Sequence, residues 1–443
     1  MTKKTMKQGT ALILATLLFV STAACSKPKG ATGGVQSASE PAKLLIWEMN
    51  WGPGEKQETA FKKLLDKFTG ENPNITVEHQ IIPWAGYYDI FMTAINSRTA
   101  PDASTGGGAQ VGLYAKMGAL TSLEPIIDGW KAEKNPILDD FSPMVTDLWR
   151  YDGDLKALMF GSDPKVIIYR KDYVEQAGVT SVPKTFGEFA DALRKVKAKF
   201  PDKVPLAMAA SDSTRTHNTM LFLAANETGF LKADMSPNLQ SKEAQESLNF
   251  IKLLYDEGLI SKGTAGYTNS ESERIFMTDG AVYVSCSSPG ALGGVPFFDQ
   301  CVVLPPLTGP SATKGHASNT PNAIFSFSNT KYPDQARAYI KFFMENSKDY
   351  FIESGHGNYP TRLSYYKDPY WANSPMHMQY FEYAINNNLP WWWPVPEMYP
   401  AILNISGERV VGDALQKIVM GMDPIKAAAE SDKAIQEILT TYN

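Results

Sequence analysis

The chain has 443 residues, of which 43% are apolar, and this is enough to build two sizeable domains. Its formal net charge is −5; without residues 1–24, which hold three lysines and no acid, 39 basic residues face 47 acidic ones and the charge is −8. A body this acidic, with no basic run, argues against nucleic acid as a partner.

The N-terminus is typical of an export signal. Three lysines lie within residues 1–7, residues 11–24 are mostly apolar, and small residues precede Cys25. The apolar stretch is shorter than the ~18 residues that favour a spanning helix, so we expect a cleaved signal peptide over residues 1–24. The cysteine at the cleavage point resembles that of a bacterial lipoprotein, which implies lipidation of Cys25. Ordinary cleavage that leaves a free Cys25 is the alternative.

Residues 25–42 are expected to form a flexible tether. They are poor in apolar residues and rich in Gly, Ser, Ala and Pro, so they cannot bury a core. The folded body should therefore begin near Lys43. No second apolar segment of the sequence is long enough to span a bilayer. We expect an exported protein, lipid-anchored to the outer face of the cell membrane or periplasmic.

Residues 43–82 predict a strand, a helix and a second strand. Residues 43–49 form a short apolar run, and we assign its Trp47 to the core. Apolar side chains recur at helical spacing in residues 55–72, and residues 75–83 alternate as a strand does. Such a βαβ unit implies a parallel sheet.

Helical and strand patterns alternate through the rest of the chain, which indicates the α/β class. We expect further helices at residues 87–97, 183–200, 241–260, 332–347 and 423–442. Asp423 is the expected N-cap of the last helix. Residues 100–108 predict a strand that leads into a glycine loop. Residues 151–170 predict a hairpin turn at residues 152–153 followed by strands.

The sequence contains no strong catalytic or metal-binding signature. Its five histidines are scattered and none forms an HExxH pattern or a close His/Cys cluster, which argues against zinc. The glycine loop of residues 105–112 lacks the GKS or GKT of a phosphate loop. We expect no cofactor and no metal. A pair of acids facing each other across a cleft, as glycoside hydrolysis requires, stays open.

Residues 389–400 place three consecutive tryptophans among four prolines. The prolines rule out a central strand and disfavour a long helix, so we expect an extended, stiff segment. Consecutive side chains point in different directions, so the three rings cannot share one core. We expect Trp392 and Trp393 to be flat platforms for a ligand and Trp391 to pack inward. The alternative is that all three cover apolar surface under the C-terminal helices.

The order of segments resembles the bacterial extracellular solute-binding proteins, the maltose-binding-like group that serves sugar ABC transporters. The motifs that carry the resemblance are, in chain order, LLIWEMN, APDAST, MGALTSLEPII, DGDLKALMFGSDPKVIIYRKDYVEQAGV, VPKTFGEF, SERIFMTDGAVYVS, VVLPPLTG, AIFSFSNTKYPDQARAYIKFF and SGHGNYPTR. Together they cover nearly all of the chain after the tether. The sequence departs from the family at residues 287–289, Ser-Ser-Pro, where an aromatic residue usually follows the strand.

The resemblance implies an α/β fold of the type II periplasmic-binding-protein kind. Two lobes are joined by a hinge, and the ligand lies in the interlobe cleft. The chain would cross between the lobes near residues 163–168, 318–323 and 359–363. The implied lobes are residues 43–164 plus 322–360 for the N-terminal lobe and 165–321 plus 361–443 for the C-terminal lobe.

The resemblance also implies a function. The protein would be the monomeric substrate-binding component of an ABC transporter, not an enzyme, and would deliver a sugar or oligosaccharide to the permease subunits. Aromatic rings cover the C–H faces of a sugar, and amides, carboxylates and guanidinium groups bind its hydroxyls. The implied ligand-binding residues are Asn50, Trp51, Trp84, Gly108, Gln110, Asp163, Arg215, His217, Ser287, Ser288, His356, Asn358, Tyr359, Arg362, Trp392 and Trp393.

Several of these residues have a plainer interpretation. Asn50 suits an ordinary turn, Gln110 a solvated position and His217 an exposed loop. Cys286 and Cys301 either form a disulfide or are two buried thiols.

Two other functions stay open. One is a secreted carbohydrate-active enzyme, and the other is a receptor for a non-sugar solute. Within the sugar class, Arg215, Arg362, His217 and His356 would suit an acidic sugar, although arginine also binds neutral ones.

Overall fold

The computed structural model describes residues 41–442 except 53, 143, 396–398 and 408. The expected signal peptide, most of the tether and Cys25 lie outside the described residues. The described residues belong to one compact unit. None of the helices described is long and apolar enough to span a bilayer.

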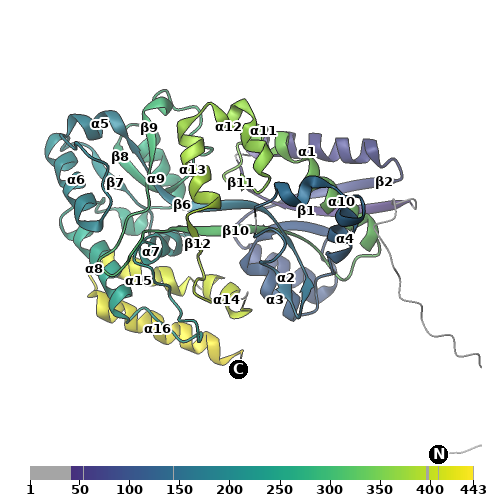
Figure 1. Ribbon diagram of the computed structural model, residues 1–443. Coiled ribbons are helices and arrows are strands. Elements are labelled where there is room, and N and C mark those ends of the chain that lie inside the picture. Colours follow the sequence, from purple (N-terminus) through teal and green to yellow (C-terminus); the bar gives the residue numbers. More distant parts are fainter. Residues whose placement is uncertain (1–40, 53, 143, 396–398, 408, 443) are drawn as a thin grey trace, which may run out of the picture. The chain divides into compact units, whose positions relative to one another are not determined.

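A mixed ten-stranded sheet runs through this unit (Figure 1). Its strands are β1 Ala42–Met49, β2 Ile75–Ile82, β3 Ala103–Gly107, β6 Leu158–Arg170, β7 Val204–Ala207, β8 Ala281–Ser287, β9 Cys301–Leu304, β10 Ala317–Ser326, β11 Tyr359–Pro360 and β12 Asn388–Pro390. A separate hairpin joins β4 Arg150–Tyr151 to β5 Asp154–Leu155, so the expected hairpin is confirmed.

Helices pack against the sheet and against one another. They are α1 Gly54–Glu71, α2 Tyr87–Ser97, α3 Ala109–Lys116, α4 Glu124–Ala132, α5 Lys171–Gln176, α6 Phe186–Lys199, α7 Thr214–Ala225, α8 Lys242–Asp256, α9 Asn269–Met277, α10 Pro333–Asn346, α11 Lys348–Glu353, α12 Pro369–Ala372, α13 Pro375–Ile385, α14 Ala401–Gly407, α15 Val410–Val419 and α16 Pro424–Thr440. Every helix expected from the sequence is present. The expected N-cap is confirmed too, since the Asp423 side chain accepts from two backbone N–H groups of α16.

The first three sheet strands, β1 to β3, are parallel and end at the same edge. β1 pairs in parallel with β2 on one side and with β3 on the other. The expected βαβ unit is therefore confirmed, and Trp47 lies in the core as expected. The loops that follow β1, β2 and β3 meet at one edge of the sheet, which is where ligands bind in α/β proteins.

The strands β6 and β10 connect the two ends of the sheet. The first part of β6 pairs with β10, and its last part pairs with β8 and β9. The other edge of β10 pairs with β3 and β12. Figure 1 shows β6 and β10 running side by side through the middle of the sheet. The three expected interlobe crossings lie on β6, β10 and β11.

Cys286 and Cys301 are free buried thiols. The same residues of β6, from Ile167 to Tyr169, pair with β8, which carries Cys286, and with β9, which begins at Cys301. The two cysteines therefore lie on opposite sides of β6, two strand spacings apart and also offset along the strand, so they are more than about 10 Å apart. A disulfide needs Cα atoms within about 7 Å. Of the two alternatives, the structure has the pair of thiols.

Candidate functional site

Two tryptophans and a glycine loop meet at the edge where β1, β2 and β3 end. The Trp51 and Trp84 rings meet edge to face, with centroids 4.9 Å apart. Trp84 is 39% exposed, and its Nε1 donates to the Asn50 carbonyl oxygen at 2.9 Å. A Cβ added to Gly107 would lie 3.6 Å from the Trp84 ring. The structure thus brings Asn50, Trp51 and Trp84 together, and we call these three residues the aromatic edge.

Trp51 is held by groups from distant parts of the chain. Its ring stacks on His356 with centroids 5.7 Å apart and contacts Phe160 edge-on at 5.5 Å. Its Nε1 donates to Thr105 Oγ1 at 3.1 Å, and its carbonyl accepts from Gly357 N at 3.1 Å. The segment just before the third expected crossing therefore contacts the aromatic edge directly.

A buried carboxyl group that our sequence interpretation missed lies below Trp51. Glu48 is fully buried, and its two carboxyl oxygens form hydrogen bonds with the hydroxyls of Thr105 at 2.8 Å and Tyr350 at 2.7 Å. Burial raises the pKa of Glu48 to about 8, so the group is mostly neutral at pH 7. An acid within the apolar run LLIWEM was the signal that would have indicated it.

The same network fixes the backbone of the loop after β1. Gln57 donates to the Met49 carbonyl at 2.6 Å and to the Tyr350 hydroxyl at 3.2 Å, and it accepts from Gly52 N at 2.9 Å. Thr105 Oγ1 accepts from Met49 N at 3.1 Å. Because these groups satisfy one another, the loop that carries Trp51 is held before any ligand binds.

Three buried polar atoms near Trp51 have no hydrogen-bond partner in the part of the chain that the structure describes. Asn322 Nδ2 donates to Asn358 Oδ1 at 2.7 Å, which leaves Asn358 Nδ2 and Asn322 Oδ1 without partners. His356 Nδ1 accepts from Asn358 N at 3.1 Å, so its unpartnered Nε2 carries the hydrogen. Burial lowers the pKa of His356 to about 3, so the ring is neutral. The group offers two donors and one acceptor.

The two candidate arginines are already ion-paired. Arg215 contacts Asp413 at 2.5 Å and donates to Gln416 Oε1 at 2.8 Å. Arg362 Nε donates to Asp140 Oδ2 at 2.6 Å. A ligand carboxylate would have to compete with a carboxylate of the protein for each of them.

His217, for which an exposed loop was the plainer interpretation, lies in the first turn of α7 instead. Thr214 is buried, and His217 is partly buried. Burial, together with the nearby Lys165 ammonium, lowers the pKa of His217 well below its ordinary value. The interpretation of His217 as an exposed loop histidine was therefore wrong.

Asp163 is part of a compensated pair on β6. Its carboxylate pairs with the Lys165 ammonium two residues along the strand, and its Oδ1 accepts from the Tyr380 hydroxyl at 3.0 Å. Asp163 is partly exposed, so it keeps room for a hydrogen bond to a ligand.

Gln110 and Gly108 have structural partners. Gln110 is buried; it accepts from Gly107 N at 2.7 Å and donates to the Tyr114 hydroxyl at 3.0 Å, so the solvated interpretation was wrong. Gly108 lies so close to β10 that a Cβ there would be 2.6 Å from the Pro321 carbonyl oxygen. Both residues shape the loop after β3.

Ser287 and Ser288 end β8 and begin the loop after it. The Ser287 hydroxyl donates to Glu273 Oε1 at 2.9 Å, and Ser288 Oγ accepts from Ala291 N at 3.2 Å. Burial raises the pKa of Glu273. Ser288 Oγ would lie 3.8 Å from a Cβ on Gly357, so this loop approaches the segment that supports Trp51.

Tyr359 is enclosed by the protein. It is buried, its ring stacks on Tyr366 at 6.1 Å, and its hydroxyl hydrogen-bonds His377 Nδ1. Its contacts are those of a core residue.

The three tryptophans after β12 form a turn. Trp393 N donates to the Pro390 carbonyl at 2.8 Å, so the expected extended conformation was wrong. Trp391 packs inward as expected, and its ring stacks on Phe230 with centroids 5.6 Å apart. The Trp392 ring meets Trp391 edge-on with centroids 5.8 Å apart. The turn buries both rings, which stabilises it. Trp392 is 2% exposed and Trp393 is partly exposed, so Trp393 has more surface to offer a ligand.

No group of three or more His, Cys, Asp or Glu side chains within the described residues is placed to hold a metal ion. The sequence model of the bacterial extracellular solute-binding proteins matches residues 63–379. The chain belongs to this family. Most of the candidate residues, from Trp84 to Arg362, lie within the match.

The solute-binding protein shares its fold with solved structures. A sugar transporter of Arthrobacter chlorophenolicus A6, solved with bound laminaribiose, superimposes with a TM-score of 0.80 at 22% identity, covering 89% of this chain and 99% of the other. The two-lobe α/β fold implied by the resemblance is thereby confirmed.

Curated relatives cover different shares of the solute-binding protein. The mannitol-binding protein of Pseudomonas aeruginosa is 24% identical over 376 residues, which are 77% of this chain and 83% of the relative. The lipoprotein LipO of Bacillus subtilis is 26% identical over 277 residues, which are 58% of this chain and 52% of the relative. Both relatives fit the description of the matched family, the bacterial extracellular solute-binding proteins.

Proposed function

We propose that the protein is the receptor of an ABC transporter and that it captures a neutral sugar, oligosaccharide or polyol between its two lobes. The observation that carries the proposal is the exposed Trp84 ring, set against Trp51 at the edge where β1, β2 and β3 end. The mannitol-binding relative and the sugar transporter solved with bound laminaribiose support this ligand class.

The aromatic edge suits the face of a sugar ring. An exposed indole covers C–H bonds, and its edge-on neighbour holds it in place. The unpartnered donors and acceptor of His356, Asn358 and Asn322 suit hydroxyls, which both donate and accept. Because hydrogen bonds within the protein already hold Trp51, ligand binding would cost little conformational entropy at this residue.

The charges near these residues favour a neutral ligand. Arg215 and Arg362 are paired with Asp413 and Asp140, and Lys165 is paired with Asp163. His356 is neutral because burial lowers its pKa to about 3. An acidic sugar would bring a carboxylate to a site whose cations are occupied, and an unpaired charge is costly to bury.

The lobe boundaries follow the strands that connect the two ends of the sheet. We place the crossings on β6, β10 and β11, with residues 43–164 plus 322–360 in one lobe and residues 165–321 plus 361–443 in the other. The aromatic edge belongs to the first lobe, and Arg215, Ser288 and Trp393 belong to the second. A ligand that touches both would favour their closure.

The last part of the proposed function is the delivery of the bound ligand to the membrane. The N-terminal sequence and the lipoprotein among the relatives support export with a lipid on Cys25. A permease of the membrane would then receive the ligand. We infer no catalysis, because the family consists of binding proteins and the arrangement of aromatic and amide groups suits binding.

A thermal-shift screen tests the ligand class. Laminaribiose, maltose and mannitol would be compared with glucuronate and gluconate at equal concentration. A ligand at about 100 times its dissociation constant adds about 2.7 kcal/mol of stability. We expect stabilisation by a neutral compound only. Stabilisation by an acid and by no neutral compound would contradict the proposal, and mass spectrometry that finds the bound glycan cleaved would favour an enzyme.

A further inference from the structure

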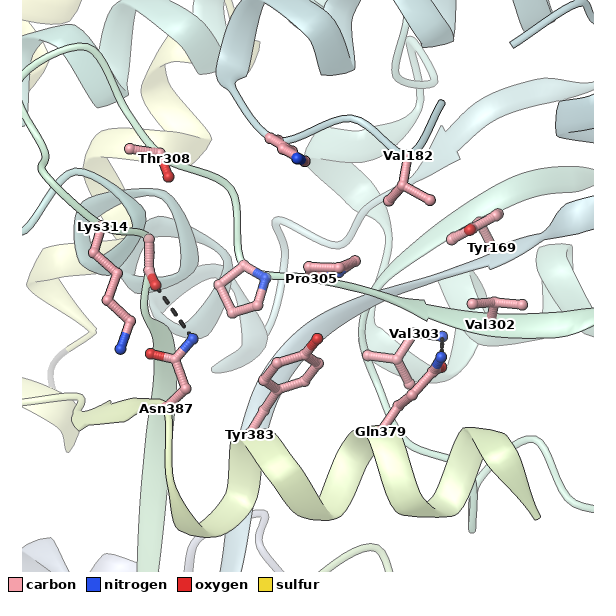
Figure 2. A pocket seen from close by; sticks show the side chains of 13 residues that line it. Tyr169, Val182, Val302, Val303, Pro305, Thr308, Lys314, Gln379, Tyr383 and Asn387 are labelled. Carbon is pink, nitrogen blue, oxygen red and sulfur yellow. Dashed lines mark hydrogen bonds between the residues drawn. The ribbon is translucent and has the colours of Figure 1, made fainter. Parts of the chain in front are cut away.

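A second concave site lies away from the aromatic edge and shares no lining residue with it. A pocket of about 430 Å³ opens between β9, α13 and the segment that precedes α6 (Figure 2). This volume lies within the range of small-molecule sites, roughly 300 to 1,000 Å³. The proposed function does not use this pocket.

The walls of the pocket are mainly apolar. Val302 and Val303 of β9, with Pro305 after it, form one wall, and Val182 lies at the rim. Figure 2 shows Tyr383 rising from α13 with its hydroxyl directed toward Pro305. A ligand here would place an apolar body against these side chains.

Two lysines line the same pocket. Lys184 and Lys314 are both exposed, and neither appears among the ion pairs of the described residues. The Glu188 carboxylate, four residues after Lys184, accepts from the backbone N–H of Lys184 at 2.7 Å, and no ion pair joins it to the Lys184 ammonium among the described residues. The charged side of the pocket is therefore positive, in contrast to the paired arginines and Lys165 of the proposed sugar site.

Asn387 is another residue that lines the pocket, and its amide oxygen is buried. Asn387 Oδ1 is buried without a hydrogen-bond partner among the described residues, while its Nδ2 makes a long contact of 3.4 Å to the Gly315 carbonyl. Gln379, the neighbouring amide on α13, is already bonded to Val303 N at 3.2 Å. One acceptor is thus left for a donor group of a ligand.

We propose that this pocket binds a small organic anion with an apolar body and an N–H or O–H donor. The anion would lie against Lys184 and Lys314, the apolar body against β9 and Tyr383, and the donor against Asn387. Such a ligand differs in charge from the neutral sugar of the proposed function, so the second site does not depend on that proposal.

A fluorescence titration with 8-anilinonaphthalene-1-sulfonate tests the site. This probe carries a sulfonate, two apolar rings and one N–H donor. We expect saturable binding to the full-length protein. The double variant K184Q/K314Q should weaken it about tenfold at low salt, since it removes both charge-assisted contacts. The matched control is Lys62→Gln, which removes an exposed lysine of α1 outside the pocket.

A second variant tests the position of the probe site without changing the charge of the pocket. Val182 is 44% exposed, so Val182→Trp should fill the pocket from its rim while the protein stays folded, and it should abolish probe binding. Absence of saturable binding would overturn the proposal, and so would unchanged affinity in both pocket variants. Loss of probe binding in Trp84→Ala alone would assign the probe to the aromatic edge and overturn it too.

Discussion

The hydroxyl of Tyr350 lies 2.7 Å from the Glu48 carboxyl group, although 302 residues separate them in the chain. Glu48 is in the first strand and Tyr350 is in α11, and both are buried. Because a charged carboxylate is costly to bury, the pair is stable while Glu48 keeps its proton. The position of Trp51, which shares Thr105 with Glu48, is thereby linked to one protonation state.

Stability should fall with rising pH because of Glu48. Its pKa is about 8 in the folded protein, against an ordinary value of 4.5. Between these values the folded state binds more protons than the unfolded state, so each pH unit removes up to about 1.4 kcal/mol. Glu48→Gln removes this contribution to the pH dependence of stability. We expect the melting temperature of the wild type, measured from pH 5 to 8, to fall more steeply than that of the variant.

The control for this experiment is Glu78→Gln, which changes an exposed acid of β2. It should keep the wild-type slope. Parallel slopes for wild type and Glu48→Gln would show that Glu48 is ionised at neutral pH, and would contradict the neutral pair.

The consecutive tryptophans should differ in what they do. Trp392 is buried, so Trp392→Ala should lower stability by about 3 to 5 kcal/mol, as large-to-small changes in cores do. Trp393 is partly exposed, so Trp393→Ala should instead weaken ligand binding by about 1 to 3 kcal/mol. Chemical denaturation and calorimetric titration of both variants measure the two effects. If both variants bound the ligand normally and both had a lowered melting temperature, the whole segment would have a packing role and no role in ligand binding.

The two cysteines should be unreactive in the native protein. Burial raises the pKa of Cys286 and of Cys301 to about 12, and only the thiolate reacts with disulfide reagents. Ellman's reagent at pH 8, followed by peptide mass spectrometry, should label neither residue in the folded protein and both in urea. A reductant should leave the melting temperature unchanged. Finding the two residues linked to each other after unfolding in urea would refute the geometry of β8 and β9.

The local parts of the fold could be predicted from the sequence because local rules determine them. Apolar spacing placed α1 between β1 and β2, and the Asp423 side chain caps α16 as its residue type indicated. The positions of Trp51 and Trp84 after their strands could also be read from the sequence, whereas the contact between their rings was found only in the structure. These features depend on neighbours in the chain or on one topological rule.

The partners of buried polar groups could not be predicted in this way. Arg362 is paired with Asp140, 222 residues away, and Glu48 with Tyr350. No local pattern indicates which distant residue neutralises a charge. The same limit explains the turn at Trp391 to Trp393, where packing on Phe230 outweighs the extended preference expected from the prolines.

The aromatic edge is the centre of the proposed function, and Trp84 allows a clean test of it. Its ring is 39% exposed, so Trp84→Ala should leave the melting temperature nearly unchanged. Tyr370 is 38% exposed on α12, which makes Tyr370→Ala a matched control that removes an aromatic ring of similar exposure elsewhere.

Calorimetric titration of wild type, Trp84→Ala and Tyr370→Ala with the neutral compound that stabilises the protein most is the decisive measurement. We predict that Trp84→Ala loses about 1 to 3 kcal/mol of binding free energy, roughly 5- to 150-fold in affinity, while Tyr370→Ala binds as the wild type does. Equal affinity in all three proteins would contradict the assignment of the ligand to the edge formed by Trp51 and Trp84.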